Sequence, residues 1–459
     1  MKIIICGAGQ VGWQIARQLS GEANEVSIVD NNPALVRRAT DNLEVQGVIG
    51  FASHPEVLDE AGARDADMII AATHSDEVNM VTCQVAHSVF NVTRKIARLR
   101  AQSYLDPRYA DLFRRDHLPI DVVINPEREV SLAALRRISA PSTFDIQEFL
   151  DGRVLLAGIA LDEDCPVLDT PLRQLTELFS TLKAMVVGVR RGARLFAPEP
   201  NDQLFAGDQI YVLSERDDLA RTLEIFGKPQ TRQERLVLIG AGNVGLTVAR
   251  TLEQGRERVR AKVIERDRAR AEHAADALER TIVLNGDGLD GELLAEAGID
   301  RADAVLALTD DDKTNVLACV RAKAMGCRLA IALVNDPAMV ALMPQLGIDA
   351  HITPRATTVS SILRHVRHGR VRSIYSIGDA EAEVIEAQVL STSALAGRTI
   401  AASDLPEGVL IGAIRKPDGR VIRPGSKTEM EAGDILIIFA LKTDVPEIER
   451  LLQVAVEWF

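Results

Sequence analysis

The sequence lacks two features that mark membrane and secreted proteins. No stretch reaches the ~18 consecutive apolar residues that a spanning helix requires, and the apolar run from Ile3 to Cys6 is too short for a signal-peptide core. The five cysteines form no CxxC pair and no even-numbered framework, so we expect reduced thiols in a cytosolic protein. We therefore predict a soluble chain without disulfides.

The sequence also has no excess of positive charge. Its 459 residues include 53 Lys and Arg against 66 Asp and Glu, which gives a net charge of −13. Because a protein that binds nucleic acid through phosphate contacts needs a basic surface, this balance argues against a nucleic-acid partner. At roughly 100 to 200 residues per domain, the length predicts two to four folded domains.

Familiar catalytic motifs are missing as well. The chain contains no HExxH, no GxSxG and no paired cluster of metal ligands, and its eight His residues are scattered. We therefore expect no catalytic residues and no metal site.

What the sequence does contain is one unit of about 230 residues that occurs twice, as in tandem-repeat proteins. The segment KIIICGAGQVG near the N-terminus returns as RLVLIGAGNVG, at an offset of 233. Residues 50–79 align without gaps on residues 286–315 and match at 12 of 30 positions. These matches predict an internal duplication.

Each unit begins with short β-branched runs that alternate with helical patterns, which is typical of a parallel sheet with crossover helices. The rest of each unit is β-rich with turn residues between short strands. We predict an α/β fold with tandem doubly wound parallel-sheet (Rossmann) domains, each followed by a small α+β module. The predicted boundaries are 1–140 for the first Rossmann domain, 141–226 for the first module, 227–234 for a linker, 235–370 for the second Rossmann domain and 371–459 for the second module.

Individual strands can be placed within this plan. The first sheet is predicted at Lys2–Cys6, Glu25–Asp30, Val45–Val48, Met68–Ala72, Lys95–Leu99 and Asp121–Asn125. The modules are predicted to contain strands at Met185–Arg190, Arg194–Ala197 and Gln209–Leu213, and at Leu410–Arg415, Arg420–Arg423 and Ile435–Phe439.

The glycine motif GAGQVG follows the first predicted strand and opens a helix, and a second strand ends in Asp30, 18 residues after the third glycine. In such a motif the glycines allow a tight turn, close approach of a phosphate and close helix packing, while the acidic residue accepts hydrogen bonds from ribose hydroxyls. The acidic residue favours NAD(H) or an adenine nucleotide over NADP(H). The alternative is that the glycines serve only strand-to-helix packing. The candidate nucleotide-binding residues are Gly7, Ala8, Gly9, Gln10, Val11, Gly12 and Asp30 in the first copy, and Gly240, Ala241, Gly242, Asn243, Val244, Gly245 and Glu265 in the second.

Two further pairs of residues are candidates in the first copy. Thr73 and His74 end the fourth strand, at the sheet edge where open sheets bind ligands, and Thr309 and Asp310 take this place in the second copy. Each threonine could contact a nucleotide or cap the next helix. Arg98 and Arg100 alternate with apolar residues in the fifth strand, so they could clamp a phosphate or form a solvated strand end. An alignment of the two copies places Ala332 and Val334 at the positions of these arginines.

The whole chain resembles the TrkA family, the cytosolic regulatory subunits of bacterial Trk potassium uptake systems. The segments that carry the resemblance are GAGQVG at 7–12, Asp30, SHPEVLDEAGARDADM at 53–68, SDEVNMVTCQVA at 75–86, IARLR at 96–100 and GAGNVG at 240–245. The resemblance implies that the Rossmann domains bind NAD(H), and ATP or ADP, through the candidate residues above. It also implies a homo-tetrameric ring that docks, at the inner face of the cell's inner membrane, onto a potassium-translocating subunit and controls its opening.

Three classes of function remain at this point. A ligand-driven switch without chemistry agrees with the absence of a catalytic acid or base. The alternative is a nicotinamide-dependent oxidoreductase with its substrate site between the two halves, which a test for NADH turnover would reveal. A redox-sensing repressor would need a helix-turn-helix and a basic face, and neither is visible in the sequence.

Overall fold

The computed structural model describes residues 1–21, 24–179, 181–229, 234–255, 259–343, 345–366, 371–378 and 381–452. The chain forms two compact units, and each combines segments from both sequence repeats. One unit comprises Met1–Ala134 with Glu234–Val366 and holds the two Rossmann domains. The other comprises Leu135–Gln233 with Arg367–Phe459 and holds the two modules.

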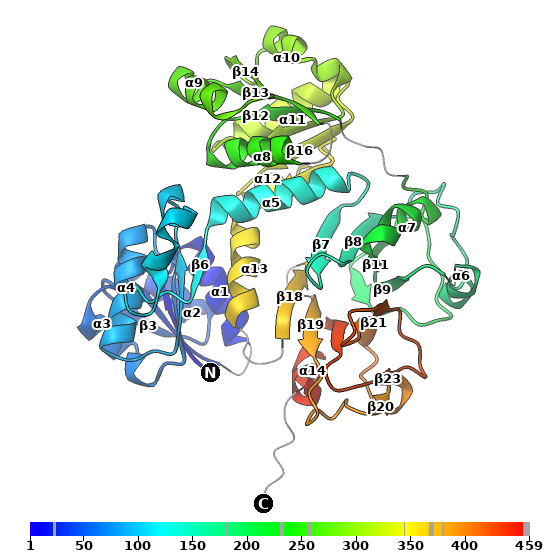
Figure 1. Cartoon of the computed structure of the whole chain (residues 1–459), viewed down its shortest axis with the longest axis horizontal. Helices are drawn as coiled ribbons and strands as arrows, with labels where there is room; N and C mark the ends of the chain where they lie inside the picture. Colours follow the sequence, from blue (N-terminus) through cyan, green and yellow to red (C-terminus); the bar gives the residue numbers. More distant parts are fainter. Residues whose placement is uncertain are drawn as a thin grey trace, which may run out of the picture. The chain divides into compact units, whose positions relative to one another are not determined.

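The first Rossmann domain has a six-stranded parallel sheet in the order β3-β2-β1-β4-β5-β6 with helices on its faces (Figure 1). Its strands are β1 (Lys2–Cys6), β2 (Glu25–Asp30), β3 (Gln46–Ile49), β4 (Met68–Ala71), β5 (Arg94–Arg98) and β6 (Val122–Ile124). Its helices are α1 (Gln10–Ser20), α2 (Pro33–Asn42), α3 (Pro55–Glu60), α4 (Asp76–Ser88) and α5 (Pro126–Ser139). The order of the strands reverses between β1 and β4, because β2 and β3 extend the sheet on one side of β1 and β4, β5 and β6 extend it on the other. Open sheets bind ligands at this point.

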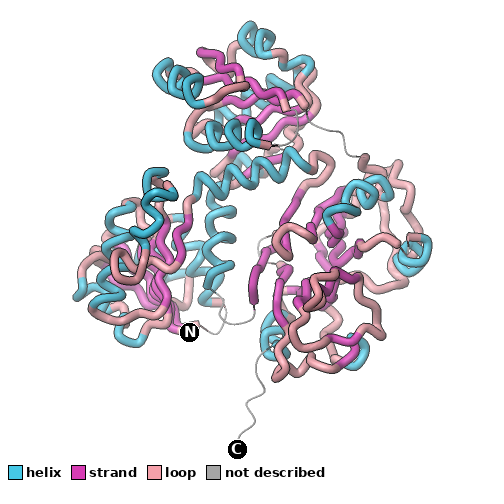
Figure 2. Tube along the Cα trace, in the orientation of Figure 1, coloured by secondary structure: helices cyan, strands magenta, loops and turns pink. Residues whose placement is uncertain are grey.

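The second Rossmann domain repeats this order as β14-β13-β12-β15-β16-β17, again with all strands parallel. Its strands are β12 (Arg235–Ile239), β13 (Arg260–Glu265), β14 (Ile282–Asn285), β15 (Ala304–Ala307), β16 (Leu329–Leu333) and β17 (Ala350–Ile352). Its helices are α8 (Asn243–Gln254), α9 (Arg268–Ala277), α10 (Gly291–Ala297), α11 (Asp312–Ala324), α12 (Pro337–Val340) and α13 (Pro354–Val366). Figure 2 shows the strands of each domain in magenta between helices in cyan.

The last helix of each Rossmann segment packs on the other Rossmann domain. Helix α13 follows β17 in the chain, yet it packs against α1 and β6 of the first domain. Its residues Val359, Ile362 and Val366 are buried in the core of that domain. In the opposite direction, Ser131 of α5 donates a hydrogen bond of 3.3 Å to the carbonyl oxygen of Val244 at the start of α8. Figure 1 shows α5 next to α8 of the second domain. The two Rossmann domains therefore exchange helices.

The modules are antiparallel sheets. The first has the order β10-β9-β11-β8-β7 and the second β18-β19-β24-β21-β22, with a separate pair β20-β23. The first contains β7 (Asp145–Phe149), β8 (Val154–Ala160), α6 (Leu172–Leu178), β9 (Ala184–Arg191), β10 (Arg194–Phe196), β11 (Gln209–Glu215) and α7 (Leu219–Ile225). The second contains β18 (Val371–Ile377), β19 (Ala382–Gln388), β20 (Arg398–Thr399), β21 (Val409–Arg415), β22 (Val421–Ile422), β23 (Glu429–Met430), β24 (Ile435–Leu441) and α14 (Val445–Leu452).

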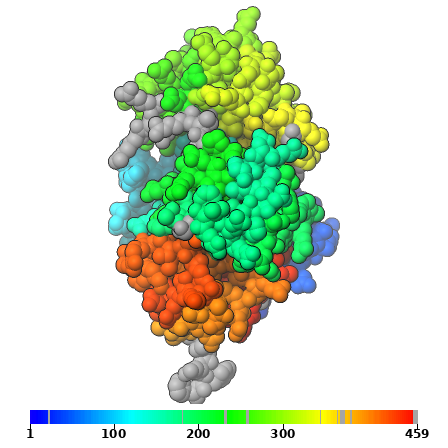
Figure 3. All heavy atoms as spheres, turned by 90° about the vertical axis from the view of Figure 1, so that its right-hand side faces the viewer, coloured from blue at the N-terminus to red at the C-terminus, as the bar shows by residue number. Residues whose placement is uncertain are grey.

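The two modules share one hydrophobic core. Phe149 and Val187 of the first module and Phe439 of the second belong to the same cluster of buried side chains. A Cβ atom at Gly188 would lie 2.7 Å from the Phe439 ring, so the glycine leaves room for the phenylalanine. In the space-filling view the first module, in green, abuts the second, in orange (Figure 3).

The predicted fold class is confirmed, and every predicted strand is present with ends that shift by no more than two residues. The sequence analysis missed β7, β8, β18 and β19, which complete the module sheets. The exchange of α5 and α13 was not predicted either. The domain boundaries stay predictions, and residues 230–233 of the predicted linker and 367–370 at the end of the second Rossmann domain lie outside the described residues.

Candidate nucleotide-binding site

One cavity of about 1040 Å³ opens between the carboxyl edges of the two Rossmann sheets. Its lining includes both glycine loops, which we call the first glycine loop (Gly7–Gly12) and the second glycine loop (Gly240–Gly245). The predicted residues that line it are Gly7, Gly9, Gln10, Val11, Asp30, Thr73, His74, Arg98 and Arg100 from the first copy, and Gly240, Gly242, Asn243, Val244 and Glu265 from the second. The structure thus brings the candidate residues of both copies to one cavity.

The backbone of the first glycine loop has the geometry that a phosphate cradle needs. Gly7 has φ +106°, a conformation that favours glycine. A Cβ at Gly9 would meet nothing within 4 Å, so the backbone there is open to a ligand. A Cβ at Gly12 would lie 1.8 Å from the carbonyl oxygen of Gly7, so only glycine fits where α1 passes the loop. Gly240, Gly242 and Gly245 repeat these three properties.

The acidic residues at the ends of β2 and β13 fix the conformation of the glycine loops through hydrogen bonds to the backbone. Asp30 Oδ2 accepts a hydrogen bond of 2.6 Å from the Ala8 backbone N–H, and its Oδ1 accepts one of 2.8 Å from the Asn32 backbone N–H. Glu265 makes the equivalent bonds to the N–H groups of Ala241 and Asp267, at 2.7 and 2.9 Å. Both carboxylates also line the cavity, where they can meet ribose hydroxyls.

Four of the predicted residues do not line the cavity. Ala8 and Ala241 are buried and donate their N–H groups to the acidic residues, while Gly12 and Gly245 face the first glycine of their own loop. They shape the loops from behind, and a direct contact with a nucleotide stays a prediction for the residues that line the cavity.

The two threonines at the ends of β4 and β15 are not helix caps. Ser75 caps α4 and Asp311 caps α11, through side-chain bonds to the N–H groups of Val78 and Thr314. The Thr73 hydroxyl instead donates to Asn79 Oδ1 at 2.6 Å, and Asn79 Nδ2 donates to the Arg98 carbonyl oxygen at 2.8 Å. This asparagine links the ends of β4 and β5 and fixes the cavity wall.

The second copy has the same link. Thr309 bonds to Asn315 Oδ1 at 2.7 Å, and Asn315 Nδ2 donates to the Leu333 carbonyl oxygen at 2.9 Å. The sequence analysis missed both asparagines. They were nevertheless visible, because the 30-residue match between the copies ends in Asn79 and Asn315.

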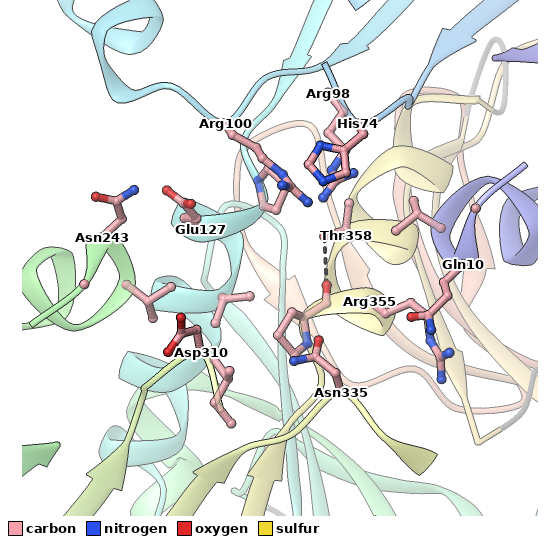
Figure 4. A pocket seen from close by; sticks show the side chains of 18 of the residues that line it. Gln10, His74, Arg98, Arg100, Glu127, Asn243, Asp310, Asn335, Arg355 and Thr358 are labelled. Atoms are coloured by element: carbon pink, nitrogen blue, oxygen red, sulfur yellow. Dashed lines mark hydrogen bonds between the residues drawn. The ribbon is translucent and has the colours of Figure 1, made fainter. Parts of the chain in front are cut away.

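Arg98 and Arg100 both line the cavity, and Figure 4 shows their guanidinium groups beside His74. The Nε atom of Arg98 is buried and has no hydrogen-bond partner among the described residues. Burial and the neighbouring Arg100 charge lower the pKa of Arg98 to about 10, so the side chain is still a cation at neutral pH. A buried N–H group without a hydrogen-bond partner is costly, and a phosphate bound in the cavity would supply an acceptor for this guanidinium.

The alignment of the fifth strands was wrong by one residue. The Asn79 and Asn315 side chains bond to the carbonyl oxygens of Arg98 and Leu333, which makes these two residues equivalent. In the same way the N–H groups of Arg100 and Asn335 both donate to the first aspartate of the preceding helix. The counterparts of the arginines are therefore Leu333 and Asn335 rather than Ala332 and Val334, and both cations are still absent from the second copy.

The second side of the cavity carries carboxylates where the first side carries other groups. Asp287, Asp310 and Asp311 stand at the positions of Phe51, His74 and Ser75. Arg266 and Arg270 are the cations on this side, and Arg270 lies 3.5 Å from Glu265. The duplicated loops therefore face different electrostatic surroundings.

The exchanged helices supply further lining residues that the sequence analysis missed. Glu127 lies in the first turn of α5, and Arg355 and Thr358 lie at the start of α13. The signal for them was the proline that follows the sixth strand in both copies, in Pro126-Glu127-Arg128 and in Pro354-Arg355-Ala356. Among the described residues, no group of three or more His, Cys, Asp or Glu side chains is placed to hold a metal ion.

Comparisons with known proteins agree with this architecture. The family model of the TrkA-N domain matches residues 3–126 and again 236–354, and the model of the TrkA-C domain matches residues 156–227 and 384–453. The chain is 47% identical to a Trk system potassium uptake protein TrkA of Azorhizobium caulinodans, over 100% of both chains. It is 36% identical to the protein of that name from Vibrio alginolyticus, over 99% of both chains.

A solved structure described as the GsuK channel bound to NAD has the same fold. It superposes with a TM-score of 0.60 at 21% sequence identity, over 98% of this chain and 78% of the channel chain. The part of this chain that the structure describes includes no helix with the length and apolar character needed to cross a bilayer.

Proposed function

Because this chain belongs to the TrkA family, we propose that it is the peripheral regulatory subunit of a Trk-type potassium uptake system and that nucleotides bound at the first glycine loop control uptake. The observation that carries the nucleotide part is the first side of the cavity. There an open glycine loop, the Asp30 carboxylate and Arg98, whose buried Nε atom has no partner among the described residues, converge. No second site of this composition lines the cavity among the described residues.

We propose NAD(H) and ATP or ADP as the nucleotides. Asp30 would accept hydrogen bonds from an adenosine ribose, and its charge disfavours a 2′-phosphate. The N–H groups at the start of α1 and the helix dipole favour a pyrophosphate. Arg98 and Arg100 would meet the terminal phosphates of ATP, where guanidinium groups make bidentate contacts. A GsuK channel with the same fold has been solved bound to NAD, which agrees with the first of these ligands.

The proposed mechanism is a ligand switch. A nucleotide that binds two conformations of the assembly with unequal affinity shifts their populations, and this difference in affinity is the free energy available to open or close a transporter. The exchanged helices offer a route for such a shift, because each helix packs on one Rossmann domain and is connected in the chain to the other. The cavity between the domains is where a ligand would affect both.

The partner and the assembly follow from the family. Full-length relatives carry the name of a potassium uptake system. We therefore propose that the chain forms a homo-tetramer, remains in the cytoplasm and docks onto a membrane potassium-translocating subunit at the inner face of the inner membrane.

An enzyme is the rival function, and it would need an acid or base near the nicotinamide. His74 is the one histidine among the described residues that line the cavity. If His74 moved a proton during hydride transfer, purified protein would consume NADH with a suitable carbonyl compound. A regulatory subunit would bind NADH without turnover.

Calorimetric titration of the full-length protein with NADH, NAD, ATP and ADP tests the proposal. We expect saturable binding of at least one dinucleotide and one adenine nucleotide, and no NADH consumption over hours. Potassium flux through proteoliposomes that hold the membrane subunit should change when this chain and the nucleotide are added together. Binding without any effect on flux would contradict the regulatory role, and absence of binding would contradict the nucleotide site.

A further inference from the structure

The start of helix α13 is the part of the cavity that the proposed function leaves unused. This helix belongs to the second sequence repeat but packs on α1 of the first Rossmann domain. Its N-terminal residues Arg355 and Thr358 line the cavity together with Gln10 of the first glycine loop. The second half of the chain therefore contributes side chains to the first nucleotide site.

Arg355 forms no ion pair among the described residues, so its guanidinium is available to a ligand in the cavity. Figure 4 shows its side chain extending toward Gln10, at the N-terminus of α1. Its Nε atom is buried and has no hydrogen-bond partner among the described residues. Because the start of α1 is where a pyrophosphate binds in a Rossmann domain, the guanidinium lies on the phosphate side of the site.

The reciprocal helix carries the opposite charge. Glu127 occupies the equivalent position at the start of α5, one residue after the proline that opens each helix. Helix α5 packs on the second glycine loop, where Ser131 bonds to the Val244 carbonyl oxygen. Glu127 accepts a hydrogen bond of 3.1 Å from Gln102 Nε2 and lies between Asn243 and Arg100 in Figure 4.

The exchange of helices thus adds to the charge difference between the two loops. The first loop faces three arginines, and the second faces several carboxylates together with Arg266 and Arg270, as described above. A phosphate in the cavity is attracted to the first side by Arg98, Arg100 and Arg355, and the Glu127 carboxylate, whose charge acts on Arg98, offsets part of that attraction.

We propose that Arg355 is a phosphate-binding residue of the first nucleotide site, supplied by the second half of the chain through helix α13. The inference rests on the proposed function, since it requires a nucleotide at the first glycine loop. It adds that a bound nucleotide contacts both sequence repeats, because its phosphates then lie between α1 from one repeat and α13 from the other. It also predicts that affinity depends on the charge at Arg355 in proportion to the number of phosphates on the ligand.

The test compares Arg355→Ala with Arg128→Ala in the full-length protein. Arg128 is an exposed arginine in the first turn of the partner helix α5 and does not line the cavity, so it is a matched control for loss of one charge. Affinities for ADP, NADH and adenosine are measured by calorimetry. We expect Arg355→Ala to weaken ADP and NADH roughly tenfold to a hundredfold, as for loss of a charge-assisted contact, and to leave adenosine binding unchanged. Arg128→Ala should leave all three unchanged.

Further variants separate a binding role from a structural one. Arg355→Lys keeps the charge but not the fork of the guanidinium, so it should restore part of the ADP affinity. If Arg355→Ala folds poorly, judged by its thermal unfolding without ligand, Arg355→Gln replaces it in the comparison. An equal loss of adenosine and ADP binding, or unchanged ADP affinity in a folded variant, would overturn the inference. If the parent protein itself binds neither ADP nor NADH, the proposed function fails instead.

Discussion

The two Rossmann domains share their backbone machinery but differ in the charges that face the cavity. Both have the sheet order of a doubly wound fold, a first glycine with φ above +100° and a buried asparagine between the fourth and fifth strands. Around the first loop lie Arg98, Arg100 and Arg355, whereas the second loop faces Asp287, Asp310 and Asp311 beside the two cations of its own side. The comparison teaches that a glycine loop identifies a cradle, while the side chains around it decide whether a phosphate is favoured there.

The largest expected effects concern the buried asparagine links that both Rossmann domains contain. Asn79→Ala and Asn315→Ala each remove a fully buried side chain that links the ends of two strands, and leave buried backbone groups without partners. We expect each variant to lower the local free energy of unfolding of its own domain by about 2–3 kcal/mol. Hydrogen exchange followed by mass spectrometry would measure this for β4 and β5 against β15 and β16.

A suitable control for these variants is Asn42→Ala, at the exposed end of α2. It should change exchange little beyond that helix end. If only one of the two variants lowered the local free energy of unfolding of its domain, the two asparagine links would not be equivalent. The Rossmann domains would then not share the same backbone support.

The acidic residues should separate the two copies. Asp30→Ala removes the acceptor for the Ala8 N–H and for a ribose, so we expect a ten- to hundredfold loss of affinity for NADH or ADP. Glu265→Ala should weaken total nucleotide binding much less, because the carboxylates around the second loop disfavour phosphate. Calorimetric titration of both variants under one salt concentration is the measurement. Equal losses would mean that both loops bind nucleotide and would remove the asymmetry.

Variants of Arg98 and Arg100 should change the affinity of the first site for ATP more than its affinity for NADH. Arg98→Ala and Arg100→Ala, made separately, should lower ATP affinity about tenfold and NADH affinity less, because ATP carries more adjacent phosphate charge. Lysine at either position should not restore the bidentate contact. Potassium flux through the reconstituted complex should also lose its response to ATP. If both variants bind ATP, ADP and NADH like the parent, the arginines do not contact phosphate.

Much of this molecule could be predicted from its sequence, for reasons that lie in local chemistry. Strands β1 and β4 are short apolar runs whose residues are almost all buried, and Asn32 before Pro33 caps α2 as such a pair should. The glycine loops are local motifs whose conformation depends on residues within one turn. The asparagine link could also have been found, since its residues match between the copies.

Other features depended on contacts between distant segments. No local pattern indicates that α13 leaves its own domain, because its buried face would suit either sheet, so Arg355 could not be assigned to the side of the first loop. The fifth strands were misaligned because Ala, Leu and Ile alternate there without a marker, and the register is fixed by hydrogen bonds to neighbouring elements, among them those of Asn79 and Asn315. Strands β7 and β18 mix polar and apolar residues and become strands through pairing with β8 and β19.

The smallest expected difference between the domains lies at the other edge of the sheets and depends on pH. Asp303 is buried and accepts hydrogen bonds from the N–H groups of Glu234 and Arg235, whereas its counterpart Asp67 is exposed and accepts one from Lys2. Burial by itself would raise the pKa of Asp303, but the hydrogen bonds from Arg235 and Glu234 outweigh it and lower that pKa below its ordinary value.

A carboxylate whose pKa is lower in the folded protein stabilises the fold above its unfolded pKa of about 4, and this contribution is lost as the pH falls through the folded value. Asp303→Asn should therefore lower the thermal unfolding temperature at pH 7, and the difference from the parent should shrink when the pH is lowered below about 4. Asp67→Asn should differ little from the parent at either pH, since an exposed carboxylate with one hydrogen bond gains little from its charge. A difference for Asp303→Asn that stays constant from pH 7 to pH 3 would show that the side chain acts through its shape rather than its charge, and the two domains would then be alike at this edge.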